Sequence, residues 1–259
     1  MNAPLEAASE LDDRSRNVLR LINRAVNSAG AVVEGNLFYH HQTRLTEEMQ
    51  PDITRLHKRR NFIRALAHAG NFLEIGFNAG HSALLALSRL PNLHYIGVDI
   101  DEYSYTRPCA SIIEESFPGR ARVIIADSRL ELPRMSLSGD PQVDAVHVDG
   151  GHDELTALLD IMHALLITRS GGIVLVDDTL HPPVRAAVDY ALSAGFAVPE
   201  TFEGKWVGEE SLAFLRLLRH RLLLEGADRL LDLLTGQPRG LCTEYVLHPL
   251  VKEFPIDVG

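Results

Sequence analysis

Two apolar segments of the sequence end on residues that can carry chemistry. The segment "AVHVDGGHDE" ends its apolar run on Asp149 and places His152 three residues later, whereas "GGIVLVDDTLHPP" ends on the adjacent acids Asp177 and Asp178. Unpaired carboxylates that are brought together repel one another, and burial adds to the cost. A hard divalent cation removes this difficulty, and oxygen ligands favour Mg²⁺ or Ca²⁺. We therefore expect Asp149, Asp177 and Asp178 to bind a divalent metal ion. The alternative is that the adjacent acids bind substrate directly or cap the following helix.

The histidine beside these acids is a candidate general base. The ordinary pKa of a histidine is about 6.5, which suits it to accept a proton from a hydroxyl group at neutral pH. His152 is the first candidate, with Asp149 as an alternative proton acceptor and His181 as a second candidate histidine. Gly150 lets the chain turn without crowding a ligand. His147 lies inside the apolar run, and we expect it to be a core residue.

Five apolar segments must position these residues. They are rich in Val and Ile, nearly continuous, and separated by helical patterns, which is typical of parallel strands that are buried on both faces. The expected strands are 71–76, 93–100, 121–127, 143–149 and 171–178. The predicted fold is an α/β fold with an open, doubly wound, mostly parallel sheet. In such sheets ligands bind outside the carboxyl ends of the strands, where the acids of this sequence lie.

The flanking segments complete the predicted architecture. Residues 1–70 are expected to form a helical extension or lid, and residues 71–259 the main part of a single domain. After the fifth strand we predict a helix near Val184 to Ser193, a short strand near 196–198, a Leu-rich helical insertion at about 211–236 and a last strand at 243–248, which gives seven strands in all. The Leu-rich insertion suits core packing or a subunit interface, so a homodimer is a reasonable expectation. "NLFYHH" in the extension is a candidate lid, with local packing as the alternative.

Composition excludes several classes of partner. The chain has 259 residues, 25 basic and 35 acidic side chains and a formal charge of −10, which disfavours nonspecific binding to nucleic acid or anionic lipid. No segment approaches the roughly 18 consecutive apolar residues that a membrane span requires. Cys109 and Cys242 make neither a disulfide framework nor a zinc pattern. We expect a cytoplasmic protein that acts on a small molecule.

The turn after the first predicted strand is a candidate cofactor site. "LEIGFNAGHSALLAL" passes from a strand through Gly76 and Gly80 into a helix. The fingerprint of dinucleotide-binding proteins has further glycines where this chain has Asn78 and His81, which argues against a nicotinamide cofactor. Asp99 nevertheless stands where an acid that binds a ribose is expected. S-adenosylmethionine has no phosphates and carries positive charge, so its site tolerates carboxylates near this turn.

These motifs resemble those of the class I S-adenosylmethionine-dependent methyltransferases over about residues 60–180. "E-I-G-x-x-x-G" is similar to their first motif, "GVDID" to the strand with the ribose acid, and "ADS" to the turn at the adenine. The resemblance implies that Asp99 binds the ribose hydroxyls and that Asp127 or Ser128 meets the adenine. The whole cofactor set that it implies is Glu74, Gly76, Asn78, Gly80, Asp99, Asp127 and Ser128.

The acids after the fourth and fifth strands are similar to the metal site of catechol O-methyltransferase and of macrolide sugar O-methyltransferases. In the catechol enzyme a lysine serves as base three residues after the first metal acid, and this chain has His152 there. The resemblance implies metal-assisted methyl transfer to a hydroxyl of a catechol-like ring, a sugar or another small natural product. The alternatives are a metal-independent methyltransferase, a nicotinamide-dependent oxidoreductase and a cofactor-binding protein without catalysis, because a fold does not establish chemistry.

Overall fold

The computed structural model describes residues 11–138, 143–199 and 213–217. The chain divides into two compact units, and the division falls between Ser128 and Arg129, at the start of a helix. The first unit contains the described residues up to Ser128. The second contains the described residues from Arg129 onward.

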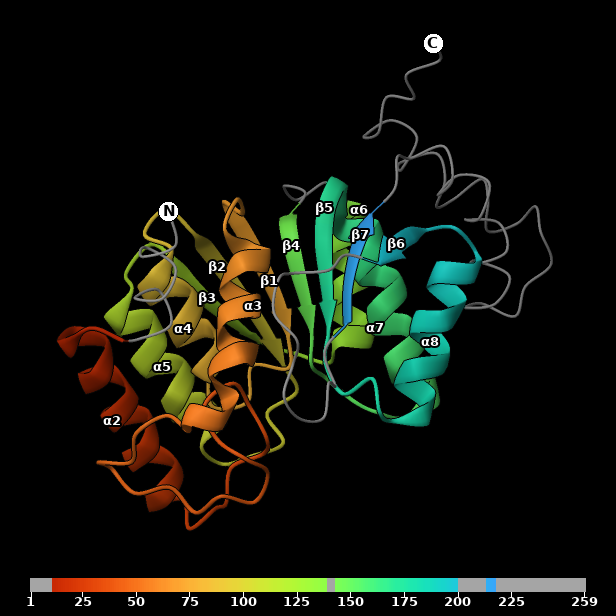
Figure 1. The fold of residues 1–259 in the computed structure, drawn as a ribbon. Coiled ribbons are helices and arrows are strands. Elements are labelled where there is room, and N and C mark those ends of the chain that lie inside the picture. Colours follow the sequence, from red (N-terminus) through yellow and green to blue (C-terminus); the bar gives the residue numbers. More distant parts are fainter. Residues whose placement is uncertain (1–10, 139–142, 200–212, 218–259) are drawn as a thin grey trace. The chain divides into compact units, whose positions relative to one another are not determined.

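The first unit is built on three parallel strands, β1 (Asn71–Ile75), β2 (His94–Asp99) and β3 (Ala121–Ile125). Their order is β3-β2-β1, and the register pairs Glu74 with Gly97 and Val98 with Ile124 (Figure 1). Three of the six residues of the middle strand are buried and only the first is exposed, as expected for a parallel strand covered by helices. The strands therefore end at one edge of the sheet, which is where the cofactor residues were predicted.

Helices surround these strands and include the predicted N-terminal extension. They are α2 (Asp13–Ser28), the short 3₁₀ helix η2 (Ile53–Arg55), α3 (Leu56–Leu66), α4 (His81–Arg89) and α5 (Thr106–Ser116). Asp12 caps α2 by accepting a hydrogen bond from the backbone N–H of Ser15 at 2.8 Å, and the Ser15 contacts lower the pKa of Asp12. The buried face of α2 packs on α4 and α5.

The segment between α2 and α3 is packed against the first unit through aromatic side chains. Phe38 and Tyr39 are buried, and both rings make edge-to-face contacts with the imidazole of His81. The buried guanidinium of Arg59 donates to the backbone carbonyl oxygens of Leu37 and Asp52, at 3.1 and 2.9 Å. Phe38 and Tyr39 thus take part in local packing, and a role of this segment as a lid stays a prediction.

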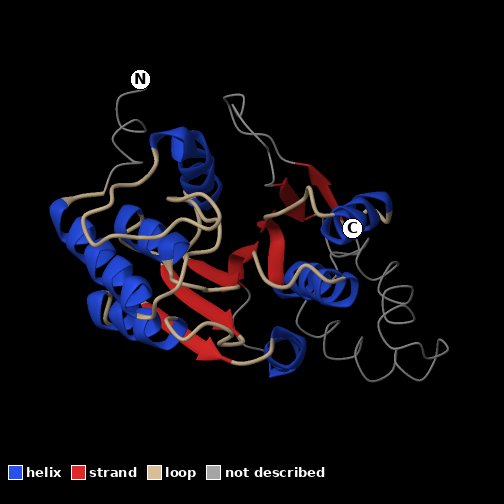
Figure 2. Cartoon of the chain, turned by 90° about the horizontal axis from the view of Figure 1, so that it is seen from below, coloured by secondary structure: helices blue, strands red, loops and turns tan. Residues whose placement is uncertain are grey.

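The described residues of the second unit form four strands and three helices. The strands are β4 (Val143–Val148), β5 (Thr168–Val176), β6 (Ala197–Pro199) and β7 (Ala213–Leu217), and the helices are α6 (Ser128–Ser138), α7 (Glu154–Ile167) and α8 (Pro182–Ser193). The strand order is β4-β5-β7-β6, with β4 and β5 parallel and β7 antiparallel to both of its neighbours. Helix α7 packs on β4 and β5, and α8 packs on α7 and β6 (Figure 2).

The structure confirms the mostly parallel α/β fold but corrects one predicted element. Residues 213–217 were placed in a Leu-rich helical insertion at 211–236, and this was wrong because they form strand β7. The strand pairs Leu215 with Val174 of β5 and thereby provides hydrogen-bond partners for that side of β5. A short apolar run does not distinguish a strand from a buried helix. The rest of the insertion and the predicted strand at 243–248 lie outside the described residues.

None of the helices in the described part of the chain has the length and apolar character needed to cross a bilayer.

Candidate active site

The turn between β1 and α4 has the backbone shape that its glycines suggested. Gly76, Asn78 and Gly80 have φ angles of +92°, +53° and +77°. Among residues with a side chain, asparagine is one of those that tolerate this left-handed region best. Asn78 therefore stands where the dinucleotide fingerprint has a glycine without excluding a left-handed turn. At Gly80 an added Cβ atom would lie 2.5 Å from the ring of Phe77, so this position also requires glycine for space.

Asp99 ends β2 beside this turn and is held by backbone donors. Its Oδ2 accepts a hydrogen bond from the N–H of Asn78 at 2.7 Å, and its Oδ1 accepts one from the N–H of Asp101 at 2.8 Å. Burial raises the pKa of Asp99 above its ordinary value, and the two backbone hydrogen bonds oppose that shift. A carboxylate has about four acceptor positions, so these two bonds leave acceptor capacity for ribose hydroxyls.

Glu74 is inside the sheet. Its side chain is fully buried, and its Oε2 accepts a hydrogen bond from the Tyr95 hydroxyl at 2.5 Å. Gly97 makes this contact possible, because a Cβ atom there would lie 2.6 Å from the Tyr95 oxygen. Burial, followed by the charge of Glu74, raises the pKa of Tyr95 well above its ordinary value. Glu74 thus has a structural partner, and its contact with a cofactor stays a prediction.

The third strand end carries the residues predicted to meet adenine. Asp127 follows β3 after one intervening residue, Ala126, and Ser128 is the first residue of α6; both side chains are half-buried. The N–H of Ala126 donates to the backbone carbonyl of Asp99 at 2.8 Å, which ties the ends of β2 and β3 together. The first unit therefore gathers the predicted cofactor residues at adjoining strand ends.

In the second unit, the acids after β4 and β5 lie side by side. The register pairs Val148 with Val176, so its continuation places Asp149 opposite Asp177, and the N–H of Asp177 donates to the Val148 carbonyl at 2.9 Å. Asp178 has a φ of +56°, so the chain has left strand geometry there. The carboxylates of Asp177 and Asp178 are consequently not forced to opposite faces of the sheet.

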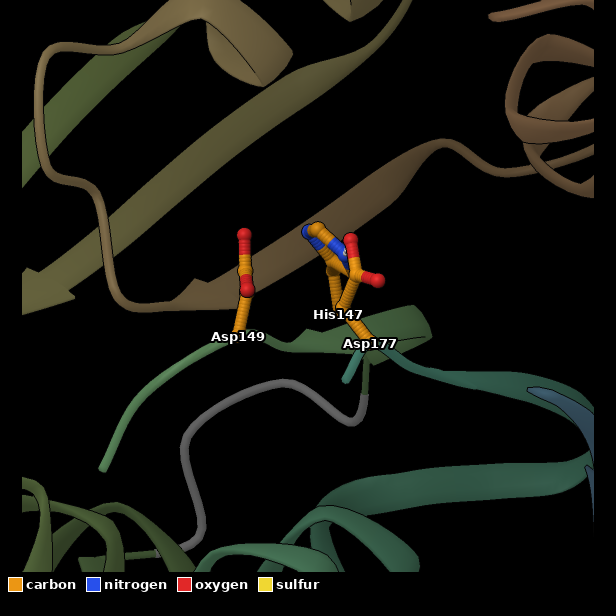
Figure 3. A group of neighbouring side chains, drawn as sticks. All are labelled: His147, Asp149 and Asp177. Carbon is orange, nitrogen blue, oxygen red and sulfur yellow. Dashed lines mark ion pairs between the residues drawn. The ribbon is translucent and has the colours of Figure 1, made fainter. Parts of the chain in front are cut away.

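The potential metal ligands form two overlapping groups that share Asp149. One group is His147, Asp149 and Asp177, and the other is Asp149, His152 and Asp178; in each, one ligand atom per residue lies within 4.8 Å of the others. Figure 3 shows the side chains of the first group extending to the same side from the ends of the two strands. Neither of these groups, found among the described residues, contains both Asp177 and Asp178.

His147 is the residue that sequence reasoning assigned only to the core. It is buried, and its Nε2 lies 4.0 Å from Oδ2 of Asp177. The signal that could have identified it is its spacing, because residues two apart on a strand share a face and Asp149 follows His147 by two.

His152 has the environment of an oriented base. Its Nε2 lies 2.9 Å from Oδ2 of Asp178, and its ring stacks on that of His181 with 4.7 Å between the centroids. His152 and Asp178 are both partly exposed, at 39% and 36%. A carboxylate that holds one nitrogen of a histidine orients the ring and stabilises its protonated form. Both candidate histidines therefore lie together, and His152 has the carboxylate partner.

Gly151, the residue before His152, has no room for a side chain. A Cβ atom at Gly151 would lie 2.8 Å from the Thr156 side chain in the first turn of α7. Asp153 caps the same helix by accepting a hydrogen bond from the Thr156 N–H at 3.1 Å. The "DGGHDE" segment thus combines a metal-ligand candidate, a close turn, a candidate base and a helix cap within one connection.

Comparison with known proteins agrees with this arrangement. Residues 73–179 match a family model described as a methyltransferase domain. No curated protein sequence matches the chain. Solved structures with the same fold include the O-methyltransferase TomG from Streptomyces achromogenes in complex with S-adenosylmethionine, with 17% identity, a TM-score of 0.57, and coverage of 81% of this chain and 91% of that one.

Two further structures are similar over most of their length. An O-methyltransferase from Bacillus cereus in complex with S-adenosylhomocysteine has 15% identity and a TM-score of 0.58, with 81% of this chain and 92% of that chain covered. A putative O-methyltransferase from Klebsiella pneumoniae has 16% identity and a TM-score of 0.59, with 84% and 95% covered. Residues 73–179 thus match a methyltransferase domain, and the chain shares its fold with O-methyltransferase structures that hold S-adenosylmethionine or S-adenosylhomocysteine.

Proposed function

We propose that this protein transfers a methyl group from S-adenosylmethionine to a hydroxyl oxygen of a small metabolite, with assistance from a divalent cation. The observation that carries the proposal is the pairing of His152 with Asp178 at 2.9 Å, in a group that also contains Asp149. A base beside potential metal ligands is what the deprotonation of a hydroxyl acceptor needs.

The first unit supplies the cofactor site in this proposal. Asp99 accepts the ribose hydroxyls, and its two backbone hydrogen bonds hold the carboxylate in position before the cofactor arrives. The left-handed turn at Gly76 and Gly80 lets the backbone approach the methionine end closely. Asp127 and Ser128 meet the adenine.

The second unit supplies the metal ligands. The donor set of carboxylates and imidazoles fits a divalent ion, because its ligand atoms are already gathered within 4.8 Å in each group. Asp149, Asp177 and Asp178 are the proposed carboxylate ligands. When bound, such an ion lowers the pKa of a coordinated hydroxyl and stabilises the oxyanion.

His152 removes the acceptor proton. Its Nε2 faces Asp178, so the proton passes from the acceptor hydroxyl to Nδ1 while Asp178 stabilises the resulting imidazolium. The acceptor oxygen then forms a bond to the methyl carbon as the bond from that carbon to sulfur breaks, which yields the methyl ether and S-adenosylhomocysteine.

The proposed acceptors are catechols, vicinal diols of sugars and related natural products. Two neighbouring oxygens can bind one cation together, which positions the hydroxyl that reacts. The relation of TomG to tomaymycin synthesis is consistent with an acceptor from natural-product metabolism. A homodimer stays a prediction.

Metal-independent methyl transfer is the second candidate. It is favoured by the same pair of His152 and Asp178, because a base oriented by a carboxylate can act without a metal ion. In that case the acids orient the acceptor through hydrogen bonds.

Calorimetry on chelator-treated protein tests the cofactor and the metal separately. We expect S-adenosylmethionine and S-adenosylhomocysteine to bind, and Mg²⁺ to bind to the complex in a second titration. Methyl transfer to a panel of catechols and sugar diols is then measured with Mg²⁺ and with chelator. Absence of cofactor binding would refute the proposed function, whereas equal activity in chelator would support the metal-independent candidate.

Replacement of the base tests the chemical step. His152→Gln is expected to lower turnover by about 10²- to 10⁴-fold while leaving cofactor affinity unchanged. His68→Gln, at an exposed histidine of the first unit, is the matched control. Unchanged turnover in the His152 variant would show that another group acts as the base, and His181 would be tested next.

A further inference from the structure

The buried histidine His147 shares a side of β4 with the metal-ligand candidate Asp149. The two residues are separated by one residue at the end of the strand, and their side chains extend in the same direction (Figure 3). Asp177 stands opposite Asp149 at the end of β5. His147 is 1% exposed and Asp177 is 5% exposed. His147 and Asp177 are therefore much less accessible to water than the neighbouring pair of His152 and Asp178, whereas Asp149 is half-buried.

The spacing of the group fits a shared ion. Nε2 of His147 and Oδ2 of Asp177 are 4.0 Å apart, which is longer than a hydrogen bond. Two atoms that each bind one ion at about 2.0–2.2 Å can be separated by at most about 4.4 Å. These two atoms are thus already close enough to bind the same ion. The ligand atoms of all three residues lie within 4.8 Å of one another, so a small adjustment of the side chains would let all three bind it.

The charge of the group also favours a cation. Two carboxylates, the buried Asp177 and the half-buried Asp149, lie beside each other, and bringing like charges together with partial loss of water is unfavourable. A neutral imidazole contributes a nitrogen lone pair and adds no negative charge. The ligand set is therefore one nitrogen and at least two oxygens.

We propose that His147 ligates the metal together with Asp149 and Asp177, and that the site consequently prefers a first-row transition ion such as Mn²⁺, Fe²⁺, Co²⁺ or Zn²⁺ to Mg²⁺ or Ca²⁺. Imidazole suits transition metals, whereas sites for Mg²⁺ and Ca²⁺ are built from oxygen ligands. The inference rests on the metal-assisted reaction proposed above and specifies its ion. It also revises the ligand set given above, because His147 replaces Asp178 beside Asp149 and Asp177, and Asp178 pairs with His152 instead.

Electron paramagnetic resonance with Mn²⁺ as the probe tests the ligand directly. Chelator-treated full-length protein is loaded with Mn²⁺, and the nitrogen coupling of a bound imidazole is recorded by electron spin-echo modulation. We expect this coupling in the unaltered protein and its loss in His147→Phe, which keeps an apolar ring in the buried site. His147→Gln is the second variant in case the first does not fold, and thermal melting in chelator checks folding.

Two histidine variants in the same unit serve as controls. His152→Gln removes the imidazole of the other group, and His163→Phe removes a histidine of α7 that belongs to neither group. Both are expected to keep the nitrogen coupling. In calorimetry, His147→Phe should weaken Mn²⁺ binding by roughly 10- to 100-fold and change Mg²⁺ binding much less.

The outcomes separate this inference from the proposed function. Mn²⁺ binding without nitrogen coupling, or coupling that persists in the His147 variants, would overturn the ligation by His147 while methyl transfer assisted by Mg²⁺ could still stand. Coupling that is lost only in the His147 variants would establish the ligand even if no acceptor were methylated. Failure of Mn²⁺ to bind at all would overturn the inference.

Discussion

The carboxylates at the strand ends of the two units have different kinds of partner. In the first unit, Glu74 accepts from the Tyr95 hydroxyl and Asp99 from two backbone N–H groups, all of which are neutral donors. In the second, the carboxylates lie beside one another and beside histidines. The first arrangement presents a positioned acceptor to hydroxyl groups, whereas the second accumulates negative charge that suits a cation. Similar strand ends thus support different tasks.

Among changes to these carboxylates, the largest expected effect concerns Asp149, which both groups of the second unit share. Asp149→Asn is expected to lower turnover by about 10²- to 10³-fold, because it weakens metal binding and the stabilisation of developing charge. Cofactor affinity should be unchanged. The measurements are initial rates of S-adenosylhomocysteine formation with a catechol and calorimetry with S-adenosylmethionine.

Asp153→Asn is the matched control for Asp149, because asparagine retains the N-cap of α7 while removing a charge from the same loop. If Asp149→Asn weakened cofactor binding as strongly as it lowered turnover, the division of tasks between the two units would be wrong.

The complementary change is in the first unit. Asp99→Asn removes a charged acceptor from the proposed ribose site, and a hydrogen bond to a charged group contributes about 1.5–3 kcal/mol, so affinity for S-adenosylmethionine should fall by roughly 10- to 100-fold. Turnover at saturating cofactor should change less. Glu102→Gln, an exposed acid close to Asp99, controls for the loss of charge, and a similar loss of affinity in both variants would argue against a specific role for Asp99.

A third change tests the close approach of Gly97 to Tyr95, whose hydroxyl donates to Glu74. Gly97→Ala would place a Cβ atom 2.6 Å from the Tyr95 hydroxyl, and overpacking of a buried site typically costs about 1–3 kcal/mol. We expect a corresponding decrease in the free energy of urea-induced unfolding. The penalty should be smaller in a Tyr95→Phe background, because the hydroxyl that meets the new methyl group is absent. Equal penalties in both backgrounds would contradict this account of Gly97.

A fourth expected effect concerns the pH dependence of stability and a buried histidine of the first unit. Burial lowers the pKa of His81 to about 3, whereas the unfolded chain has the ordinary value of about 6.5. Between these values the unfolded state binds a proton that the folded state does not, so stability falls as the pH falls through this window. At pH 5 the loss amounts to about 2 kcal/mol.

His81→Phe should remove this part of the acid sensitivity while keeping a ring against Phe38 and Tyr39. Urea unfolding at pH 7 and pH 5 measures it. His163 of the second unit provides the comparison. Burial lowers its pKa to about 4, and its contribution to the loss of stability at low pH should persist in the His81 variant. An unaltered difference between the two pH values in the His81 variant would show that His81 is protonated without cost.

Much of the fold and the candidate site could be predicted from local patterns. Apolar runs bounded by glycines and acids located β1 to β5, and strand ends located Asp99, Asp149 and Asp177. Both signals are local, because side-chain alternation and turn chemistry depend on a few neighbouring residues. The mostly parallel arrangement followed from strands that are buried on both faces.

Contacts between distant residues decided the rest. Several of these contacts join residues that no sequence spacing connects. They are the pairing of β7 with β5, the hydrogen bond from Tyr95 to Glu74, and the separate grouping of Asp177 with His147 and of Asp178 with His152. His147 is buried as expected, and its place beside Asp177, at 4.0 Å, also makes it a ligand candidate. The sequence alone determined which residues stand at the strand ends, whereas the tertiary structure decided which of them meet, because strand pairing and close packing depend on the whole chain.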